Sequence, residues 1–295
     1  MSGKTNKTLL LTGATGFLGA RLAPVLEASW RVARASRTAE GPGAVRLDLS
    51  EPDSIRRAFD LVRPDAVVHA GAEALPDPCE RDPERARRVN AEATRVLAEL
   101  CAASGARLVH FSTDLVFDGE KGWYGEDDAT GPISVYGRTK LAAEEAVLSK
   151  APGAVVLRVS NVYGRPLGTR SCFVDELRAA LAAGRPIGAF VDQWRSPTDG
   201  DSLPEVVSRL LADPDLEGVY HWAGAERATR FETAIALCRV FGFDERLVHP
   251  TRAADKAFAA PRPRDTSLDS SRLSAAVGLA PTPMAAGFAA LKAAA

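Results

Sequence analysis

The sequence lacks the features that would assign it to a membrane or to nucleic acid. No apolar stretch reaches the ~18 residues that a membrane-spanning helix needs. The short apolar run near the start leads into glycines and not into a cleavage site. Lys and Arg together number 37 against 38 Asp and Glu, so no basic excess predicts binding to nucleic acid or to an anionic membrane surface. We therefore expect a cytoplasmic protein that binds neither.

Cysteine is scarce, and its spacing argues against a metal site. The four cysteines lie far apart, at Cys79, Cys101, Cys172 and Cys238, with no C-x-x-C motif and no Cys/His cluster. Such isolated cysteines are typical of reduced thiols in a cytosolic protein. We expect no metal ligands in this chain.

Apolar runs alternate with amphipathic segments over the first 160 residues. The pattern predicts strands at 7–12, 30–36, 44–49, 65–70, 107–112 and 154–160, with helices at 17–28, 52–62, 88–104 and 134–150. Strands with few charges that alternate with helices are parallel, which predicts a doubly wound α/β sheet of the Rossmann type. Residues 1–165 are expected to form this domain. Residues 166–295 are expected to form mostly a smaller lobe, with some segments returning to the first domain.

The stretch TGATGFLG at 12–19 joins the first strand to the first helix. Gly13, Gly16 and Gly19 are spaced for a tight turn, a backbone approach to a pyrophosphate and close packing of helix on strand. The helix amides then face a diphosphate. A glycine trio in this context predicts a dinucleotide site, to which the loop also contributes Thr15, Phe17 and Leu18.

The residues after the second strand indicate which dinucleotide binds. An acid that accepts from the ribose 2′-hydroxyl favours NADH, whereas this stretch, RVARASRT, offers Arg34, Ser36 and Arg37 and no acid. Since Arg pairs with a 2′-phosphate, we expect NADPH, with NADH the weaker alternative. Further cofactor contacts are expected from Asp48 to the adenine, from the backbone at 69–72, and from the remaining candidates Leu49, His69, Ala70, Gly71, Ala72 and Asn90.

Three residues near the carboxyl end of the fifth strand form a candidate catalytic group. Thr113 ends that strand, where open parallel sheets place ligands, and Tyr136 and Lys140 lie one turn apart on the following helix. In order, TGxxGxxG, Asp48, Thr113 and Y-x-x-x-K at 136–140 resemble the extended short-chain dehydrogenase/reductase superfamily. The motifs LVHFSTDLVFDG, YGRTKLAAEEAV, LRVSNVYG, DQWRSPT, GVYHWAG and RPRDTSLDSSRL narrow the resemblance to its dTDP-4-dehydrorhamnose reductase subfamily.

This resemblance implies NADPH-dependent reduction of a 4-keto group on a nucleotide-linked 6-deoxysugar by a homodimer. Tyr136 would be the general acid, and Thr113 would donate to the carbonyl oxygen. Lys140 would lower the pKa of Tyr136 with its positive charge and bond the nicotinamide ribose. Tyr136 and Lys140 would thus also touch the cofactor.

The substrate side departs from the subfamily pattern. Leu115 replaces its usual Tyr and Asn161 its usual Trp, whereas Arg195 is either a pyrophosphate ligand or an exposed loop residue. Asp114 and Gln193 complete the main substrate candidates, and Asp192, Thr198, Arg262 and Arg264 are weaker ones. Two alternatives stay open. One is a partner-binding, NADP-binding protein resembling the regulatory β subunit of methionine adenosyltransferase; the other is a nucleotide-sugar epimerase or dehydratase, in which Asp114 would be the extra acid/base.

Overall fold

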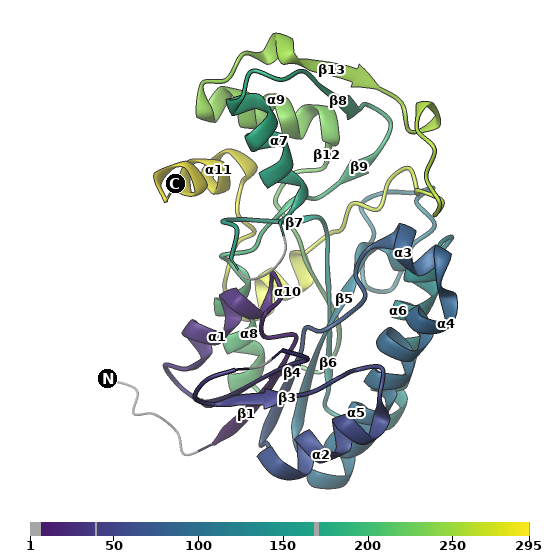
Figure 1. The fold of residues 1–295 in the computed structure, drawn as a ribbon, viewed down its shortest axis with the longest axis vertical. Coiled ribbons are helices and arrows are strands. Elements are labelled where there is room, and N and C mark those ends of the chain that lie inside the picture. The colour runs from purple at the N-terminus through teal and green to yellow at the C-terminus, as the bar shows by residue number, and fades with distance from the viewer. Residues whose placement is uncertain (1–6, 39, 168–170, 295) are drawn as a thin grey trace.

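The computed structural model describes residues 7–38, 40–167 and 171–294, which form a doubly wound α/β fold (Figure 1). Its central sheet has the order β11-β6-β5-β4-β1-β2-β3, and every neighbouring pair is parallel. The strands are β1 (Thr8–Thr12), β2 (Arg31–Ser36), β3 (Ala44–Arg46), β4 (Ala66–His69), β5 (Arg107–Thr113), β6 (Val155–Val159) and β11 (Gly218–Trp222). The predicted fold class is confirmed.

Helices cover both faces of the sheet, each through its own apolar cluster. On one face lie α2 (Pro52–Val62), α5 (Ala93–Ser104) and α6 (Val135–Lys150), packed through residues such as Phe59, Leu97 and Val147. On the other lie α1 (Gly19–Leu26), α8 (Leu203–Ala212) and α10 (Ser271–Val277). The strands read as continuous apolar runs because both of their faces are buried.

The helix expected at 88–104 differs from the prediction at its start. Arg87–Glu92 forms a π-helical turn before α5 begins, and π-turns of this kind are often found at functional sites. Gly105, with φ 74°, ends α5 as predicted. Two short helices were not predicted, because each is too short to show a periodic pattern: α3 (Pro76–Arg81) and α4 (Pro83–Ala86).

A second group of elements lies beyond the carboxyl ends of the strands (Figure 1). In it α7 (Phe173–Ala182), α9 (Arg230–Phe241) and α11 (Met284–Ala293) share a core with the parallel pair β8 (Ile187–Phe190) and β13 (Val248–Thr251). The predicted loop at 192–201 contains two-residue strands. These are β9 (Trp194–Arg195), paired with β12 (Ala228–Thr229), and β10 (Thr198–Asp199), paired with β7 (Val162–Tyr163). Short 3₁₀ turns lie at Asp114–Val116, Glu245–Leu247 and Ala253–Asp255.

Segments after residue 165 also contribute to the first domain. β11 pairs with β6 at one edge of the sheet, and α8 and α10 pack on its face. The proposed boundary between two domains at residue 165 stays a prediction. In the part of the chain that the structure describes, no helix is both long enough and apolar enough to span a bilayer.

Candidate active site

The glycine-rich turn after β1 lies in close backbone contact with the segment that follows β4. Gly13 has φ 67°, and a Cβ there would lie 2.6 Å from the Cα of Gly71. A Cβ on Gly19 would collide with the carbonyl oxygen of Gly13, so α1 starts directly against the turn. At Gly16 a Cβ would meet only the Gly13 oxygen, at 3.1 Å. The fold thus requires glycine at positions 13 and 19. The backbone at Gly16 is less crowded than at these two positions.

A buried arginine holds this loop, and sequence reasoning missed it. The Arg21 guanidinium donates to the Phe17 carbonyl oxygen at 2.9 Å and lies 3.8 Å from the centroid of the Phe17 ring. It also pairs with Asp201 at 3.1 Å, in the turn before α8. Phe17 of the loop is therefore held by Arg21, which is itself anchored in the turn before α8. An Arg in an apolar helix turn was the only available signal.

The end of β2 carries an unpaired polar atom. The Ser36 hydroxyl is buried and has no hydrogen-bond partner in the part of the chain that the structure describes. Arg37 is exposed beside it, whereas Arg34 is ion-paired with Glu27 at 2.6 Å. A buried polar group without a partner is unfavourable and points to a ligand or water. Ser36 and Arg37, and not Arg34, are the residues available to a 2′-phosphate.

Asp48 lies within electrostatic reach of Arg37. Burial raises the pKa of the Asp48 carboxyl, but hydrogen bonds from the Ser50 hydroxyl and amide outweigh it, and the pKa is lowered on balance. These two bonds, at 2.7 and 2.8 Å, reach the same oxygen, Oδ1. Asp48 is thus a fixed carboxylate whose other oxygen, Oδ2, accepts no hydrogen bond from the described residues.

The segment after β4 contacts the glycine turn through its backbone. The side chain of His69 points inward, where Nδ1 is 2.6 Å from the Thr12 hydroxyl and Nε2 is 3.0 Å from that of Thr94. Beyond it, Ala70, Gly71 and Ala72 run beside the turn, and a Cβ on Gly71 would come within 2.7 Å of the Leu49 side chain. The His69 side chain is therefore used within the fold, which leaves its backbone and residues 70–72 to border a ligand.

Asn90 supports this segment instead of facing outward. Its Oδ1 accepts from the Glu73 amide at 2.9 Å, and its Nδ2 donates to the Glu73 carbonyl and the Thr139 hydroxyl, both at 3.1 Å. Both amide hydrogens are therefore in use. The expectation of a direct cofactor contact from Asn90 is replaced by an indirect one, because its side chain ties the 70–75 loop to α6.

The structure brings Thr113, Tyr136 and Lys140 together at the end of β5. All three are buried. Burial raises the pKa of Tyr136 well above its ordinary value, and a hydrogen bond with Thr113 offsets only part of this shift. Desolvation of the phenol is the largest influence on the Tyr136 pKa, and a lowering of that pKa by Lys140 stays a prediction. The Tyr136 hydroxyl thus keeps its proton throughout the neutral range.

Lys140 turns toward the strand that carries Thr113. Its Nζ donates to the Phe111 carbonyl oxygen at 2.7 Å and lies 3.0 Å from His110 Nε2. Burial lowers the pKa of Lys140 to about 7, although the charge of Glu144 acts in the opposite direction. The ammonium is therefore held by two acceptors from consecutive residues, His110 and Phe111.

Asp114 and Arg195 form a buried ion pair with an Nε–Oδ2 distance of 3.5 Å. Asp114 also accepts from the Ser160 and Thr266 hydroxyls at 3.0 and 2.5 Å. Arg195 donates to the carbonyl oxygens of Trp194 and Pro263, and burial lowers its pKa. The alternative that Arg195 is an exposed loop residue is wrong. Neither side chain is free, so a direct substrate contact from either is not supported.

The remaining substrate candidates divide between the site and the scaffold. Leu115 packs against the buried cluster that contains Tyr136, and Gln193 is buried with an Nε2 that has no partner among the described residues. Asn161 adopts φ 40°, a conformation that Asn tolerates and that is unfavourable for a Trp. The carboxylate of Asp192 accepts from the Ala253 amide, and the Thr198 hydroxyl donates to the Ser160 carbonyl, so both have structural partners.

Arg230 and Arg262, with Arg195, make an arginine cluster near Asp114. Burial first, and then Arg195 and Arg262, lower the pKa of Arg230 to about 10. Among the described residues, no carboxylate lies within ion-pair distance of Arg230, and Nη1 of Arg262 is buried without a partner. Arg262 also pairs with Asp77 at 2.9 Å. This excess of positive charge attracts an anion. Sequence reasoning did not single out Arg230.

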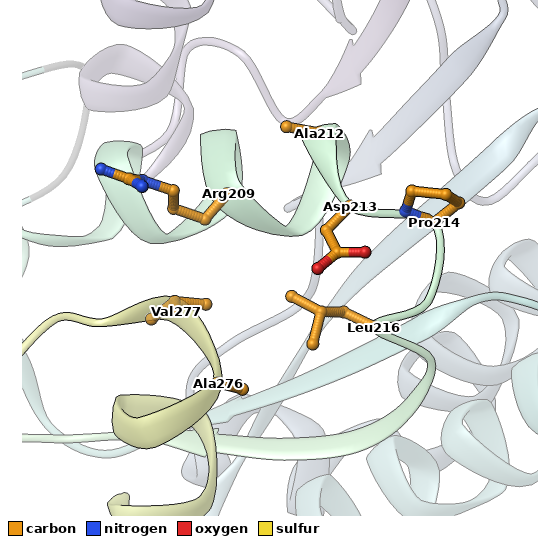
Figure 2. Close-up of a pocket in the computed structure, with 7 residues that line it drawn as sticks. All are labelled: Arg209, Ala212, Asp213, Pro214, Leu216, Ala276 and Val277. Carbon is orange, nitrogen blue, oxygen red and sulfur yellow. The ribbon is translucent and has the colours of Figure 1, made fainter.

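Two concavities lie away from this constellation. A cavity of about 310 Å³ is lined by Arg209, Asp213, Leu216 and Val277, at the turn that leads into β11 (Figure 2). A second, of about 450 Å³, is bounded by α9 and Met284. Neither cavity is lined by Thr113, Tyr136 or Lys140. The candidate active site is therefore identified from its side chains and not from a cavity.

Comparisons with known proteins agree with this geometry. The family model described as RmlD substrate binding domain matches residues 7–294. A dTDP-4-dehydrorhamnose reductase of Mycolicibacterium smegmatis is 36% identical over 275 residues, which cover 92% of this chain and 81% of that protein. Methionine adenosyltransferase 2 subunit beta of Bos taurus is 32% identical over 275 residues, covering 91% and 82%.

The fold has close structural counterparts as well. A dTDP-4-dehydrorhamnose reductase from Bacillus anthracis, solved in complex with NADP, superimposes with a TM-score of 0.89 at 24% identity, covering 99% of this chain and 100% of that one. At this level of identity the likeness establishes the fold.

Proposed function

Because the chain belongs to the RmlD substrate binding domain family, within the extended short-chain dehydrogenase/reductase superfamily, we propose that it is an NADPH-dependent reductase of a 4-keto group on a nucleotide-linked deoxysugar. The observation that carries the proposal is the buried Thr113, Tyr136 and Lys140 group at the carboxyl end of β5. The named reductase relative, at 36% identity, supports the same activity.

The residues fit a dinucleotide with a 2′-phosphate. The turn at Gly13 and Gly19 admits no side chain, the Ser36 hydroxyl at the end of β2 is buried without a partner among the described residues, and Arg37 adds a positive charge. In this assignment Ser36 and Arg37 bind the phosphate, the free oxygen of Asp48 meets the adenine, and the 69–72 backbone borders the cofactor. NADPH, when bound, supplies the hydride.

The chain's own residues supply the proton and stabilise the developing charge. Reduction builds negative charge on the ketone oxygen, which needs hydrogen-bond donors and one proton. Tyr136, protonated because burial raises its pKa, is the general acid, and Thr113 is the second donor to that oxygen. Lys140 holds its ammonium toward the same region and is the candidate ligand of the nicotinamide ribose.

We predict that NADPH binds at least tenfold tighter than NADH, as roughly 1.4 kcal/mol from one new charge-assisted contact would give. Arg37→Ala should remove most of this preference, because its side chain is exposed beside Ser36 and forms no ion pair with the described residues. Arg34→Ala is the matched control, since Arg34 already pairs with Glu27. Titration of nicotinamide fluorescence measures both affinities, and equal binding of NADPH and NADH by the unmodified protein would refute the assignment.

The arginine cluster is the proposed site for the nucleotide diphosphate. Arg230→Met is expected to raise the KM for the nucleotide sugar by about tenfold or more, with little change in kcat, because a diphosphate is bound alike in ground and transition states. Arg239→Met is the control on the same helix, since Arg239 is exposed and pairs with Glu245. Steady-state kinetics decides the point: an unchanged KM in Arg230→Met would move the diphosphate elsewhere.

A second candidate function is a cofactor-loaded, partner-binding protein. It is favoured by relatives named methionine adenosyltransferase 2 subunit beta, such as the bovine one at 32% identity, and by Leu115 and Asn161 on the substrate side. An epimerase or dehydratase is less well supported, because Asp114 is fully engaged in the Arg195 pair. Consumption of NADPH with dTDP-4-keto-6-deoxysugars separates reductase from binding protein. The homodimer and the cytoplasmic location also remain proposals.

A further inference from the structure

His110 lies on β5, on the same strand as Thr113, and faces the candidate lysine. It is fully buried, and its Nε2 is 3.0 Å from the Lys140 Nζ. The adjacent carbonyl oxygen of Phe111 accepts from the same ammonium at 2.7 Å. Consecutive residues of one strand therefore supply two acceptors to one cation.

The contact fixes the protonation of the imidazole. An ammonium only donates, so Nε2 must be the unprotonated nitrogen and the proton must sit on Nδ1. Among the described residues Nδ1 has no hydrogen-bond partner. An apolar side chain would avoid this buried, unpaired N–H, so packing alone does not explain a histidine at this position.

Among the described residues, the titratable groups that act on this contact come from β4 and α6. On β4 the ring of His69 lies 5.1 Å away between centroids, and its pKa is lowered to about 3, chiefly by burial. On α6, Glu144 is an attractive charge for Lys140, and Tyr136 keeps its proton. Burial and then the charge of Lys140 hold the pKa of His110 well below its ordinary value, so it stays a neutral acceptor.

An ammonium has three N–H donors, and the wall of β5 engages two of them. We propose that His110 is a positioning residue for Lys140, whose Nε2 holds the ammonium against β5 so that a single N–H is left to point into the site. That this N–H serves catalysis rests on the proposed reductase function.

Two substitutions of His110 separate the effect of its hydrogen-bond acceptor from the effect of its packing. His110→Gln keeps a long side chain with an acceptor oxygen, whereas His110→Leu keeps the bulk and removes the acceptor. Since a hydrogen bond to the charged form favours that form, His110→Leu should lower the pKa of Lys140 by roughly one unit or more. His110→Gln should stay within about half a unit of the unmodified chain. His221→Leu is the control, as it removes another buried histidine, one that contacts Arg158 and not Lys140.

The readout is the pH titration of the lysine Cε signals in ¹³C-labelled protein, with Lys140→Arg identifying the Lys140 signal. In parallel, the alkaline limb of kcat should move to lower pH, with about a tenfold loss at pH 8, in His110→Leu and not in His110→Gln. An unshifted Lys140 titration in a folded His110→Leu variant, or equal losses in both variants, would overturn the inference. Because the titration needs no substrate, a shifted Lys140 in a protein that reduces no ketone would sustain the positioning role and reject the reductase function.

Discussion

Replacing Tyr136 with Phe is expected to lower the turnover of ketone reduction by roughly 10³-fold, within the range that general acids contribute. The reason is local: Tyr136 carries the phenol of the triad, a far stronger acid than the Thr113 alcohol, and burial keeps its pKa high enough to hold the proton throughout the neutral range. The affinity for NADPH should change by no more than about twofold, because the glycine turn, Ser36 and Arg37 are untouched. Stopped-flow turnover together with fluorescence titration tests both halves of this expectation.

The structure offers a matched control for the loss of a tyrosine hydroxyl. Tyr163 is buried among Phe288 and its neighbours in the second core, and its hydroxyl has no hydrogen-bond partner among the described residues. Tyr163→Phe should therefore leave turnover unchanged. If Tyr136→Phe also turned over at the normal rate, Tyr136 would be removed from the mechanism.

Arg158→Met is expected to reduce the free energy of unfolding by roughly 3–5 kcal/mol, the loss typical when one partner of a buried ion pair is removed. Arg158 contacts Glu144 at 2.6 Å through Nη2 and 3.0 Å through Nε, and both side chains are almost fully buried. The Ser112 hydroxyl adds a bond of 2.5 Å to the same carboxylate. Without Arg158, Glu144 would be a buried charge with only that hydroxyl as its partner.

Urea denaturation with a matched surface pair measures this effect. Arg95 and Glu99 form an exposed ion pair at 2.7 Å on α5, four positions apart, and Arg95→Met should change stability by less than about 0.5 kcal/mol. An Arg158→Met variant no less stable than Arg95→Met would mean that the buried network is not structural. Since Glu144 is also the attractive charge near Lys140, removal of the compensating Arg158 cation should in addition raise the pKa of Lys140.

The sequence predicted what local spacing encodes. The glycine turn, the alternation of strands and helices, and the spacing of Tyr136 and Lys140 on one helix each follow from short patterns whose geometry is local. That the strands are parallel follows from their alternation with helices. These parts of the fold needed no long-range information.

The sequence could not predict contacts between residues far apart in the chain. Arg195 was expected at a pyrophosphate or in an exposed loop, and it instead pairs with Asp114, 81 positions earlier, because β9 folds back over the end of β5. Lys140 was expected to act on Tyr136, but the orientation of its Nζ depends on His110 and Phe111 of a different element. Arg21 and Arg230 acquire their meaning only from partners such as Asp201 and Arg262.

The most direct test of the central claim is the transfer of a labelled hydride. Purified protein is incubated with 4-deuterated NADPH, prepared on either face of the nicotinamide, and with dTDP-4-keto-6-deoxysugars, and the products are analysed by mass spectrometry and proton NMR. The account predicts one deuterium at C4 of the sugar from only one of the two labelled faces, with one NADPH oxidised per product, and no transfer by Tyr136→Phe. NADPH that binds tightly but delivers no deuterium to any of these ketones would contradict it and favour the partner-binding function.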